Sequence, residues 1–336
     1  MDKPLITFMI VAYNQEQYVG EAVAGAFSQT YCPLEILLSD DCSTDRTYDV
    51  MERMAAEYRG VHHVRLNRTD RNLGLGGHIS ALMELTRGEL IVVAASDDIS
   101  LPQRTQRVWQ TYDDSGGKAM SIYSSFLMID EQGRQQEIVR KPPNETAYDL
   151  EAYIKAGGVC GCSHAWHRRV FDIFGPLYPG TVYEDKAIPL RSVLLGEIRF
   201  IDEPLVLYRR HSQSITGPRR HTASELDVVA DVVKRQTRRL LTLKNYERDL
   251  QREHESIRID AATRNRLAAS IRKRICRAEL EIAFNQGSLG DRLGVIRQGV
   301  AAHAGLPQLA KWCVQLIYPY HLRRARRKLL SETGNG

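Results

Sequence analysis

The sequence predicts an α/β fold with a mostly parallel central sheet, followed by a helical C-terminal region. Three observations favour this prediction. The first hundred residues alternate short apolar runs with segments of helical spacing. Two acidic pairs directly follow two of the apolar runs. The charge reverses along the chain, because residues 1–218 carry 22 Lys and Arg against 29 Asp and Glu, whereas residues 219–336 carry 24 against 12.

Four strands are expected in the first hundred residues, each a short apolar run that ends at a polar turn. They are Leu5–Val11, Leu34–Leu38, Val61–Leu66 and Leu90–Ala95. Helices are expected between them, where apolar residues recur at helical spacing. They are Tyr18–Gln29, Thr44–Tyr58 and Ile79–Thr86, with a Gly- and Asn-rich loop over residues 67–77. Strands that alternate with helices in this way run parallel.

The following hundred residues predict mixed structure, and the final third predicts long helices. Strands are expected over Met120–Ile129 and Ile198–Tyr208, with a helix over Val182–Leu195. Beyond residue 222, apolar residues follow two helical stripes. The chain is therefore divided into a domain over residues 1–218, with halves at about 1–105 and 106–218, and a basic helical region over residues 219–336.

Composition narrows the class of protein. Of the 336 residues 43% are hydrophobic and 26% are charged, which is typical of a globular protein. No apolar stretch approaches the length that spans a bilayer. The six cysteines include Cys160 and Cys162 as an isolated C-x-C, without the second cluster that a zinc site needs. We expect reduced thiols and a cytoplasmic location.

Two acidic pairs, Asp40–Asp41 and Asp97–Asp98, fall at the carboxyl ends of predicted parallel strands. Such ends are where α/β sheets bind ligands. Adjacent carboxylates repel unless a cation or ligand hydroxyls absorb their charge, and Mg²⁺ or Mn²⁺ on a diphosphate does this. Each pair also has a simpler interpretation, as a turn that caps the following helix or, for Asp98, as a cap for the helix after Pro102.

A third acidic pair, Glu184–Asp185, opens the predicted helix before residue 195. It is a candidate general base, although acidic residues also favour helix starts for purely electrostatic reasons. Arg209, Arg210 and His211 follow the last predicted strand. Arginine side chains match phosphate oxygens and histidine binds metals, but such a run is also common at solvated edges.

Taken together, the motifs resemble the inverting glycosyltransferases of family two, which have the GT-A fold. The similar stretches are FMIVAYNQEQYVGEAVAGAFSQTYCPLEILLSDDCSTDRT, NLGLGGHISALMELTRGELIVVAASDDISLPQR, GCSHAWHRRVFDIFGPL, VYEDKAIPLR and LYRRHSQSIT. Their order and spacing are specific, and they cover roughly residues 4–218. The C-terminal third lies outside the resemblance.

The resemblance implies a nucleotide-sugar donor and assigns roles to single positions. Ala12, Tyr13 and Asn14 would hold the nucleotide, and Asp41 would contact its base. Asp97 would hold the ribose or the sugar. Asp98, with His211, would hold Mg²⁺ or Mn²⁺. Arg209 or Arg210 would face the diphosphate. Asp185 would deprotonate the acceptor hydroxyl, with Glu184 in support. The implied acceptor is a glycan or lipid-linked saccharide, as in surface polysaccharide biosynthesis.

The chain departs from the family pattern in two places. Ser96 occupies the position where many members have the first Asp of D-x-D, a known variant. No Q-x-x-R-W motif and no membrane spans follow, so the sequence favours an enzyme that adds one sugar over a processive synthase.

Other classes of protein fit less well. A nucleotidyltransferase needs a cationic loop after the first strand, and a dehydrogenase needs G-x-G-x-x-G there. An inactive nucleotide-sugar sensor would have lost the metal or base residue.

For the basic C-terminal region, no motif indicates that it binds nucleic acid. Basic residues cluster at Arg272–Arg274 and Arg323–Lys328, and the aromatic residues Trp312, Tyr318 and Tyr320 precede the second cluster. This pattern is typical either of a solvated appendage or of a region that binds the anionic inner face of the membrane.

Overall fold

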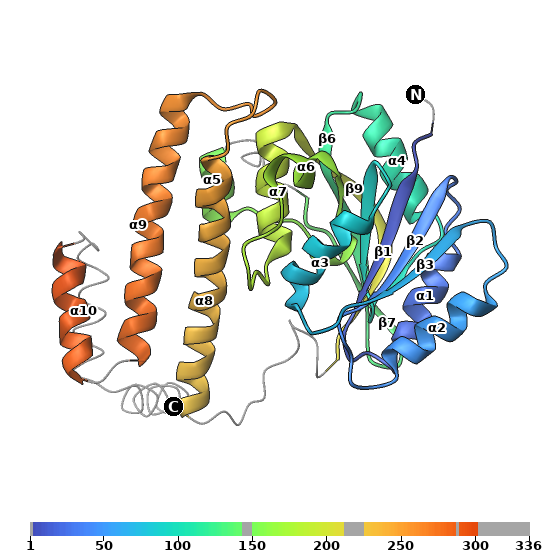
Figure 1. The fold of residues 1–336 in the computed structure, drawn as a ribbon, viewed down its shortest axis with the longest axis horizontal. Helices are drawn as coiled ribbons and strands as arrows, with labels where there is room; N and C mark the ends of the chain where they lie inside the picture. Colours follow the sequence, from blue (N-terminus) through green and yellow to red (C-terminus); the bar gives the residue numbers. More distant parts are fainter. Residues whose placement is uncertain (1–2, 143–149, 212–224, 287–288, 302–336) are drawn as a thin grey trace, which may run out of the picture. The chain divides into compact units, whose positions relative to one another are not determined.

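The computed structural model describes residues 3–142, 150–211, 225–286 and 289–301. Its described strands form one sheet of nine strands, eight of them in the order β3-β2-β1-β4-β8-β6-β9-β5, with β7 beside β6 (Figure 1). The strands are β1 (Ile6–Ala12), β2 (Leu34–Asp40), β3 (His63–Arg68), β4 (Leu90–Ala95), β5 (Ile99–Ser100), β6 (Ala119–Ile129), β7 (Gln135–Val139), β8 (Ala165–His167) and β9 (Glu197–Arg209).

The sheet has a parallel half and a mixed half. Strands β3, β2, β1 and β4 are parallel neighbours, and the α-helical crossovers between them force this arrangement. Strand β8 pairs antiparallel with both β4 and β6, and β6 pairs parallel with β9. The predicted α/β class is therefore confirmed, with antiparallel strands in the second half.

Helices cover the parallel half of the sheet, which explains why its strands read as continuous apolar runs. The helices of this half are α1 (Val19–Phe27), α2 (Thr47–Glu57), α3 (Gly74–Leu85) and α4 (Arg104–Asp114). Phe8, Ile10 and Ile36 belong to a buried core with residues of α1 and α4. The intervening Met9 and Leu37 are buried as well, so both faces of the sheet are covered.

Helix α3 begins earlier than the sequence suggested. A loop was expected up to residue 77, but the helix starts at Gly74, whose φ of 68° is in the left-handed region that glycine tolerates. Gly76 lies against Thr181, where an added Cβ would come within 2.5 Å of the Thr181 carbonyl oxygen. The glycines therefore permit close packing at the start of a helix.

The second half of the domain contains short helices and one longer one. They are α5 (Leu150–Ala156), the 3-10 turn η2 (Gly161–Ser163), α6 (Arg169–Phe174) and α7 (Glu184–Leu195). Helix α7 begins with the predicted acidic pair, and β9 extends through the position of Pro204.

The chain divides into two compact units, and the division is not a single cut. The first unit contains Met1–Pro218 together with Arg248–Arg264. Within it, the Asp249 carboxylate forms a buried ion pair with Arg191 of α7, with Nε and Oδ2 2.7 Å apart. The Arg258 N–H donates to the Leu194 carbonyl at 2.8 Å. A boundary at residue 218 alone therefore omits a segment that packs on α7.

The second unit contains Arg219–Glu247 and Asn265–Gly336. Its described helices are most of α8 (Glu225–Leu250), most of α9 (Ala261–Gln286) and α10 (Leu289–Ala301). The Lys244 ammonium of α8 lies 3.4 Å from the Glu279 carboxylate of α9. Leu280 and Phe284 of α9 pack with Val295 of α10. No described helix is both long and apolar enough to cross a bilayer, and Trp312, Tyr318, Tyr320 and the 323–328 cluster lie outside the described residues.

Candidate active site

The loop after β1 presents an aromatic ring at the carboxyl end of the sheet. Tyr13 is 45% exposed, although it directly follows a buried strand. Asn14 has a φ of 51°, a conformation that Asn accepts better than most residues. Its N–H donates to Ser43 Oγ at 2.8 Å, and its Oδ1 accepts from the Thr44 N–H at 2.9 Å. Asn14 thus joins this loop to the one after β2 and holds Tyr13 in place.

The carboxylate of Asp41 organises the loop that leads into α3. Its Oδ1 accepts from the Leu73 N–H at 2.9 Å and from the Thr69 hydroxyl at 3.1 Å, and its Oδ2 accepts from the Gly74 N–H at 2.9 Å. A carboxylate has about four acceptor sites, so a fourth donor, such as a nucleobase N–H, can still bind. The predicted contact with a base stays a prediction, and the structure adds a role in holding α3.

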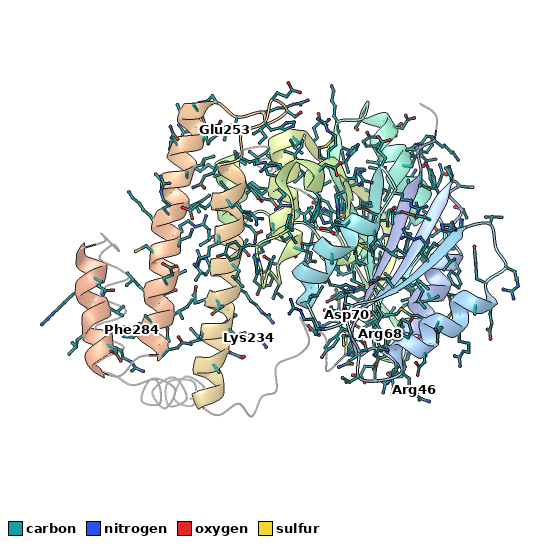
Figure 2. All side chains as sticks on the ribbon, in the orientation of Figure 1. Arg46, Arg68, Asp70, Lys234, Glu253 and Phe284 are labelled. Atoms are coloured by element: carbon teal, nitrogen blue, oxygen red, sulfur yellow. The ribbon has the colours of Figure 1, made fainter. Side chains whose placement is uncertain are left out.

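Asp40 is buried beneath the same turn and is neutralised locally. Its Oδ2 lies 3.3 Å from Nε of Arg68, and it accepts from both the N–H and the hydroxyl of Ser43. Figure 2 shows Arg46, Arg68 and Asp70 at this end of the sheet, around the loops that carry Tyr13 and Asp41. Asp40 is therefore a structural residue, and Asp41 is the member of the pair that can meet a ligand.

Asp98 is the most unusual carboxylate in the described chain. It follows β4, is only 2% exposed, and its Oδ1 accepts from the Arg209 N–H at 2.9 Å. Its Oδ2 is buried without a hydrogen-bond partner among the described residues. Burial, reinforced by the neighbouring Asp97, raises the pKa of Asp98 well above its usual range. A carboxylate oxygen in this state indicates that a cation belongs beside it.

The helix-capping interpretation of Asp98 is excluded. Helix α4 begins at Arg104, and the side chain of Gln29, not that of Asp98, accepts from the Thr105 N–H in its first turn at 3.0 Å. Arg104 is instead buried, and its guanidinium donates to Ser100 Oγ at 2.8 Å and to the Val93 carbonyl at 2.7 Å. Burial lowers the pKa of Arg104 to about 10, and the Asp98 charge opposes that change. No sequence pattern predicted this buried cation, because an Arg in the first turn of an amphipathic helix normally faces water.

His211 lies beside the second acidic pair, as expected, but its described contact is with Asp97. Its Nε2 is 2.9 Å from Asp97 Oδ2, and its ring centroid lies 4.9 Å from that of Tyr18. The predicted metal contact of His211 stays a prediction. To contact a cation, His211 must either bind the cation together with Asp97 or release Asp97 and bind the cation in its place.

The two arginines at the end of β9 differ in how far their side chains are exposed. Arg210 is exposed and available to a ligand. Arg209 is 1% exposed, and its guanidinium donates to the Asp97 carbonyl at 3.1 Å, the Glu131 carbonyl at 3.1 Å and the Glu21 carboxylate at 3.0 Å. This environment does not support a diphosphate contact for Arg209, so Arg210 carries that prediction.

The residues around Asp98 fit a divalent cation that is bound partly by the protein and partly by a diphosphate. No group of three or more His, Cys, Asp or Glu that could hold a metal by itself occurs among the residues with described positions. Mg²⁺ typically binds through one or two carboxylates and completes its shell with phosphate oxygens and water. The unpartnered Asp98 Oδ2 supplies such a carboxylate oxygen, next to Asp97 and His211.

Glu184 and Asp185 begin α7 as a pair of carboxyl groups with raised pKa values. Burial raises the pKa of Asp185 to about 6. Burial and the neighbouring Asp185 charge raise the pKa of Glu184 to about 8. Asp185 Oδ1 has no hydrogen-bond partner within the described chain. An ionised carboxylate that keeps an open lone pair near neutral pH has the properties of a general base.

The turn η2 lies against this pair and depends on a glycine. A Cβ on Gly161 would come within 3.1 Å of Glu184 Oε1 and 3.3 Å of Asp185 Cβ. The same turn connects the two acidic sites. Burial raises the pKa of the Cys162 thiol, helped by the charge of Asp98, and the neighbouring Cys160 thiol is influenced by Asp185. The turn η2 therefore lies near both Asp98 and Asp185.

Comparison with known proteins identifies the family. The profile described as Glycosyl transferase family 2 matches residues 7–174, which is half of the chain and includes β1, Asp41 and Asp98. The chain belongs to this family. The matched range ends before α7, so it includes neither Glu184 and Asp185 nor the arginines at the end of β9.

Several curated proteins are similar in sequence. The succinoglycan biosynthesis protein ExoO of Rhizobium meliloti is 33% identical over 208 residues, which cover 61% of this chain and 54% of that protein. The glycosyltransferase GlyG of Streptococcus pneumoniae is 25% identical over 248 residues, covering 68% and 77%. A protein of Mycobacterium tuberculosis is 26% identical over 217 residues, covering 62% and 60%. The chain thus spans less than two thirds of the mycobacterial relative and of ExoO.

Solved structures share the fold of this family 2 chain. TarS of S. aureus (residues 1–349), in complex with UDP-GlcNAc, superposes with a TM-score of 0.56 at 15% identity, covering 89% of this chain and 87% of that one. The mannosyltransferase PcManGT of Pyrobaculum calidifontis, in complex with GDP-Man and Mn²⁺, gives 0.53 at 16% identity, covering 95% and 88%. The GT-A fold expected from the sequence is therefore confirmed.

Proposed function

We propose that this chain transfers a sugar from a nucleotide-diphosphate sugar to a hydroxyl of a glycan or lipid-linked saccharide, with inversion at the anomeric carbon. The observation that carries the proposal is that two carboxylates near η2 each keep one oxygen without a described hydrogen-bond partner. Asp98 has an oxygen that lacks a partner where a cation would bind, and Asp185 has an oxygen that lacks a partner where a base would act. A transferase of this kind needs both, at the leaving-group side and the acceptor side of one sugar.

The residues support a single displacement. Asp185 accepts the proton of the acceptor hydroxyl while that oxygen forms a bond to the anomeric carbon. The bond between the anomeric carbon and the diphosphate oxygen breaks, and the nucleoside diphosphate leaves with the electron pair. Mg²⁺ or Mn²⁺, held by Asp98 with Asp97 and His211 nearby, would neutralise the charge that develops on the diphosphate. Arg210 is the exposed cation on the same strand end.

The donor and the pathway are inferred from the relatives. Similar structures hold UDP-GlcNAc in one case and GDP-Man with Mn²⁺ in another, and ExoO acts in succinoglycan biosynthesis. These relatives support a nucleotide-sugar donor and a role in polysaccharide biosynthesis. Tyr13 is exposed at the expected nucleobase position, where its ring can stack on a base.

The test is turnover of a panel of UDP-, dTDP- and GDP-sugars with Mn²⁺, repeated with EDTA and with Asp98→Ala. We expect one donor class to be consumed, and both EDTA and Asp98→Ala to abolish its consumption. Full activity in EDTA, or in Asp98→Ala, would contradict the metal assignment. Consumption of a nucleoside triphosphate in place of any nucleotide-sugar would instead favour the nucleotidyltransferase alternative.

We also propose that the second unit binds the anionic inner surface of the membrane. Arg266, Arg272 and Lys273 are exposed on α9, and each Lys or Arg near such a surface contributes about 1 kcal/mol. Flotation with vesicles that contain phosphatidylserine tests this. Replacing these three residues by Gln should abolish flotation at low salt, whereas Gln at the exposed Arg53, Arg59 and Arg87 should not. Equal loss in both triple variants would contradict a specific role for α9.

A further inference from the structure

Four polar contacts inside the protein engage the side chain of Arg209. Arginine has five side-chain N–H donors. Nε donates to the Asp97 carbonyl, Nη1 donates to the carbonyls of Glu131 at 3.1 Å and Asp130 at 3.4 Å, and Nη2 donates to Glu21 at 3.0 Å. The side chain is buried, so these contacts are shielded from water.

The same residue touches both members of the second acidic pair. Its main-chain N–H donates to Asp98 Oδ1 at 2.9 Å, and its side chain donates to the main chain of Asp97. These two bonds fix the direction in which the unpartnered Asp98 Oδ2 points. Arg209 therefore controls the carboxylate that a cation would meet.

Arg209 also orders the aromatic side of this site. Its guanidinium carbon lies 4.8 Å from the ring centroid of Tyr18, and the Tyr18 ring in turn packs against His211 at 4.9 Å. His211 is thereby held 2.9 Å from Asp97. One guanidinium thus connects α1, which contributes Glu21, with the turn at residues 130–131 and the end of β9.

We propose that Arg209 is a positioning residue that holds together the loop after β4 and the end of β9, which carry the divalent-cation site, and that it does not bind the diphosphate. The chemical identity of the cation rests on the proposed function. Groups that orient metal ligands without touching the metal typically change metal affinity by 10–100-fold when replaced. Glu21 is the anchor that can be tested most cleanly, because its carboxylate is 53% exposed and its described polar contact is Arg209.

The experiment measures Mn²⁺ binding directly, from the EPR signal of free Mn²⁺, with the full chain in the presence of UDP or GDP. The variants are Glu21→Gln and Arg209→Lys, with Asp98→Asn to mark complete loss of the site. Glu203→Gln is the matched control, because it removes an ion pair of Glu203 with Arg107 elsewhere on β9. Nucleotide affinity without metal is measured in parallel.

We expect Glu21→Gln and Arg209→Lys to weaken Mn²⁺ binding by about tenfold or more, with nucleotide affinity in the absence of metal unchanged. Glu203→Gln should bind Mn²⁺ like the wild type. The proposal is overturned if Glu21→Gln binds Mn²⁺ normally, whether or not Arg209→Lys folds. It is also overturned if Arg209→Lys weakens metal-free nucleotide binding as the main effect, which would indicate a direct diphosphate contact.

Failure of the proposed function gives a different pattern. If no nucleotide-sugar is consumed but Glu21→Gln still weakens Mn²⁺ binding, the positioning role holds and the transferase proposal fails. If sugars are transferred normally and Mn²⁺ binding is unaffected by Glu21→Gln, the transferase proposal holds and the role of Arg209 is wrong.

Discussion

At the scale of single residues, the proposed chemistry depends on carboxyl groups whose pKa values burial has raised. Asp185 and Asp98 each keep one oxygen without a partner, and both have raised pKa values. Leaving such groups unpaired lowers the stability of the fold. That arrangement is expected where a ligand supplies the missing partner, and it separates these two residues from Asp40, whose charge is neutralised by Arg68.

Replacing Asp185 by Asn should remove the base and keep the shape. General base catalysis contributes roughly 10²–10⁴-fold, so turnover should fall by about that factor while affinity for the donor is retained. Glu184→Gln should lose less, because Glu184 is expected to support Asp185. Steady-state turnover and calorimetric donor binding check both statements. An Asp185→Asn enzyme with near-normal turnover would assign the base to another residue, with Glu184 the next candidate.

The pH dependence should report the raised pKa of Asp185. A base acts only when deprotonated, so turnover should fall as the pH drops through about 6, the value to which burial raises this pKa. The Lys186 charge lowers the same pKa, so Lys186→Gln should move the acidic limb to higher pH. The profile is measured at saturating Mn²⁺. An acidic limb that Lys186→Gln leaves unmoved would belong to another group.

At the scale of elements, the sequence predicted the parts that local pattern determines. The apolar runs identified β1, β2 and β4, and the acidic pairs were correctly placed at their carboxyl ends. The start of α3 was missed, because Gly74 and Gly76 suggested a loop, whereas they are needed for the turn and for close packing on Thr181. The roles of Arg104 and Arg209 were missed because burial of an arginine depends on distant segments and leaves no local pattern.

Helix α7, which carries the proposed base, should depend on the segment that starts in the last turn of α8. Breaking a buried ion pair from one side costs about 3–5 kcal/mol, because the other charge stays buried and unpaired. Asp249→Asn should therefore lower the free energy of urea unfolding by about that much, since it leaves Arg191 unpaired. Glu253→Gln, at an exposed ion pair 3.9 Å from Arg264, should change stability by less than about 0.5 kcal/mol. Equal effects would mean that Arg191 and Asp249 do not hold α7.

At the scale of the whole molecule, the charge reversal along the chain predicted two units, but only the structure could show how the chain divides. Residues 248–264 return to the first unit after the chain has entered α8. Nothing in their sequence signals this, because the partner of Asp249 is 58 residues away. A chain cut at residue 218 would therefore lose part of the first unit. Charge replacement on α9 is for this reason the better test of membrane binding by the second unit.

The anomeric configuration of the product tests the central claim most directly. If Asp185 acts on the acceptor side, opposite the leaving diphosphate, one in-line displacement must invert the anomeric carbon. Proton NMR of the glycoside formed by the wild-type protein gives the configuration, because the new glycosidic bond does not mutarotate. We expect a β-linked product from an α-linked donor, or an α-linked product from a β-linked one. A product that retains the configuration of the donor would contradict the single-displacement mechanism and the role of Asp185 in it.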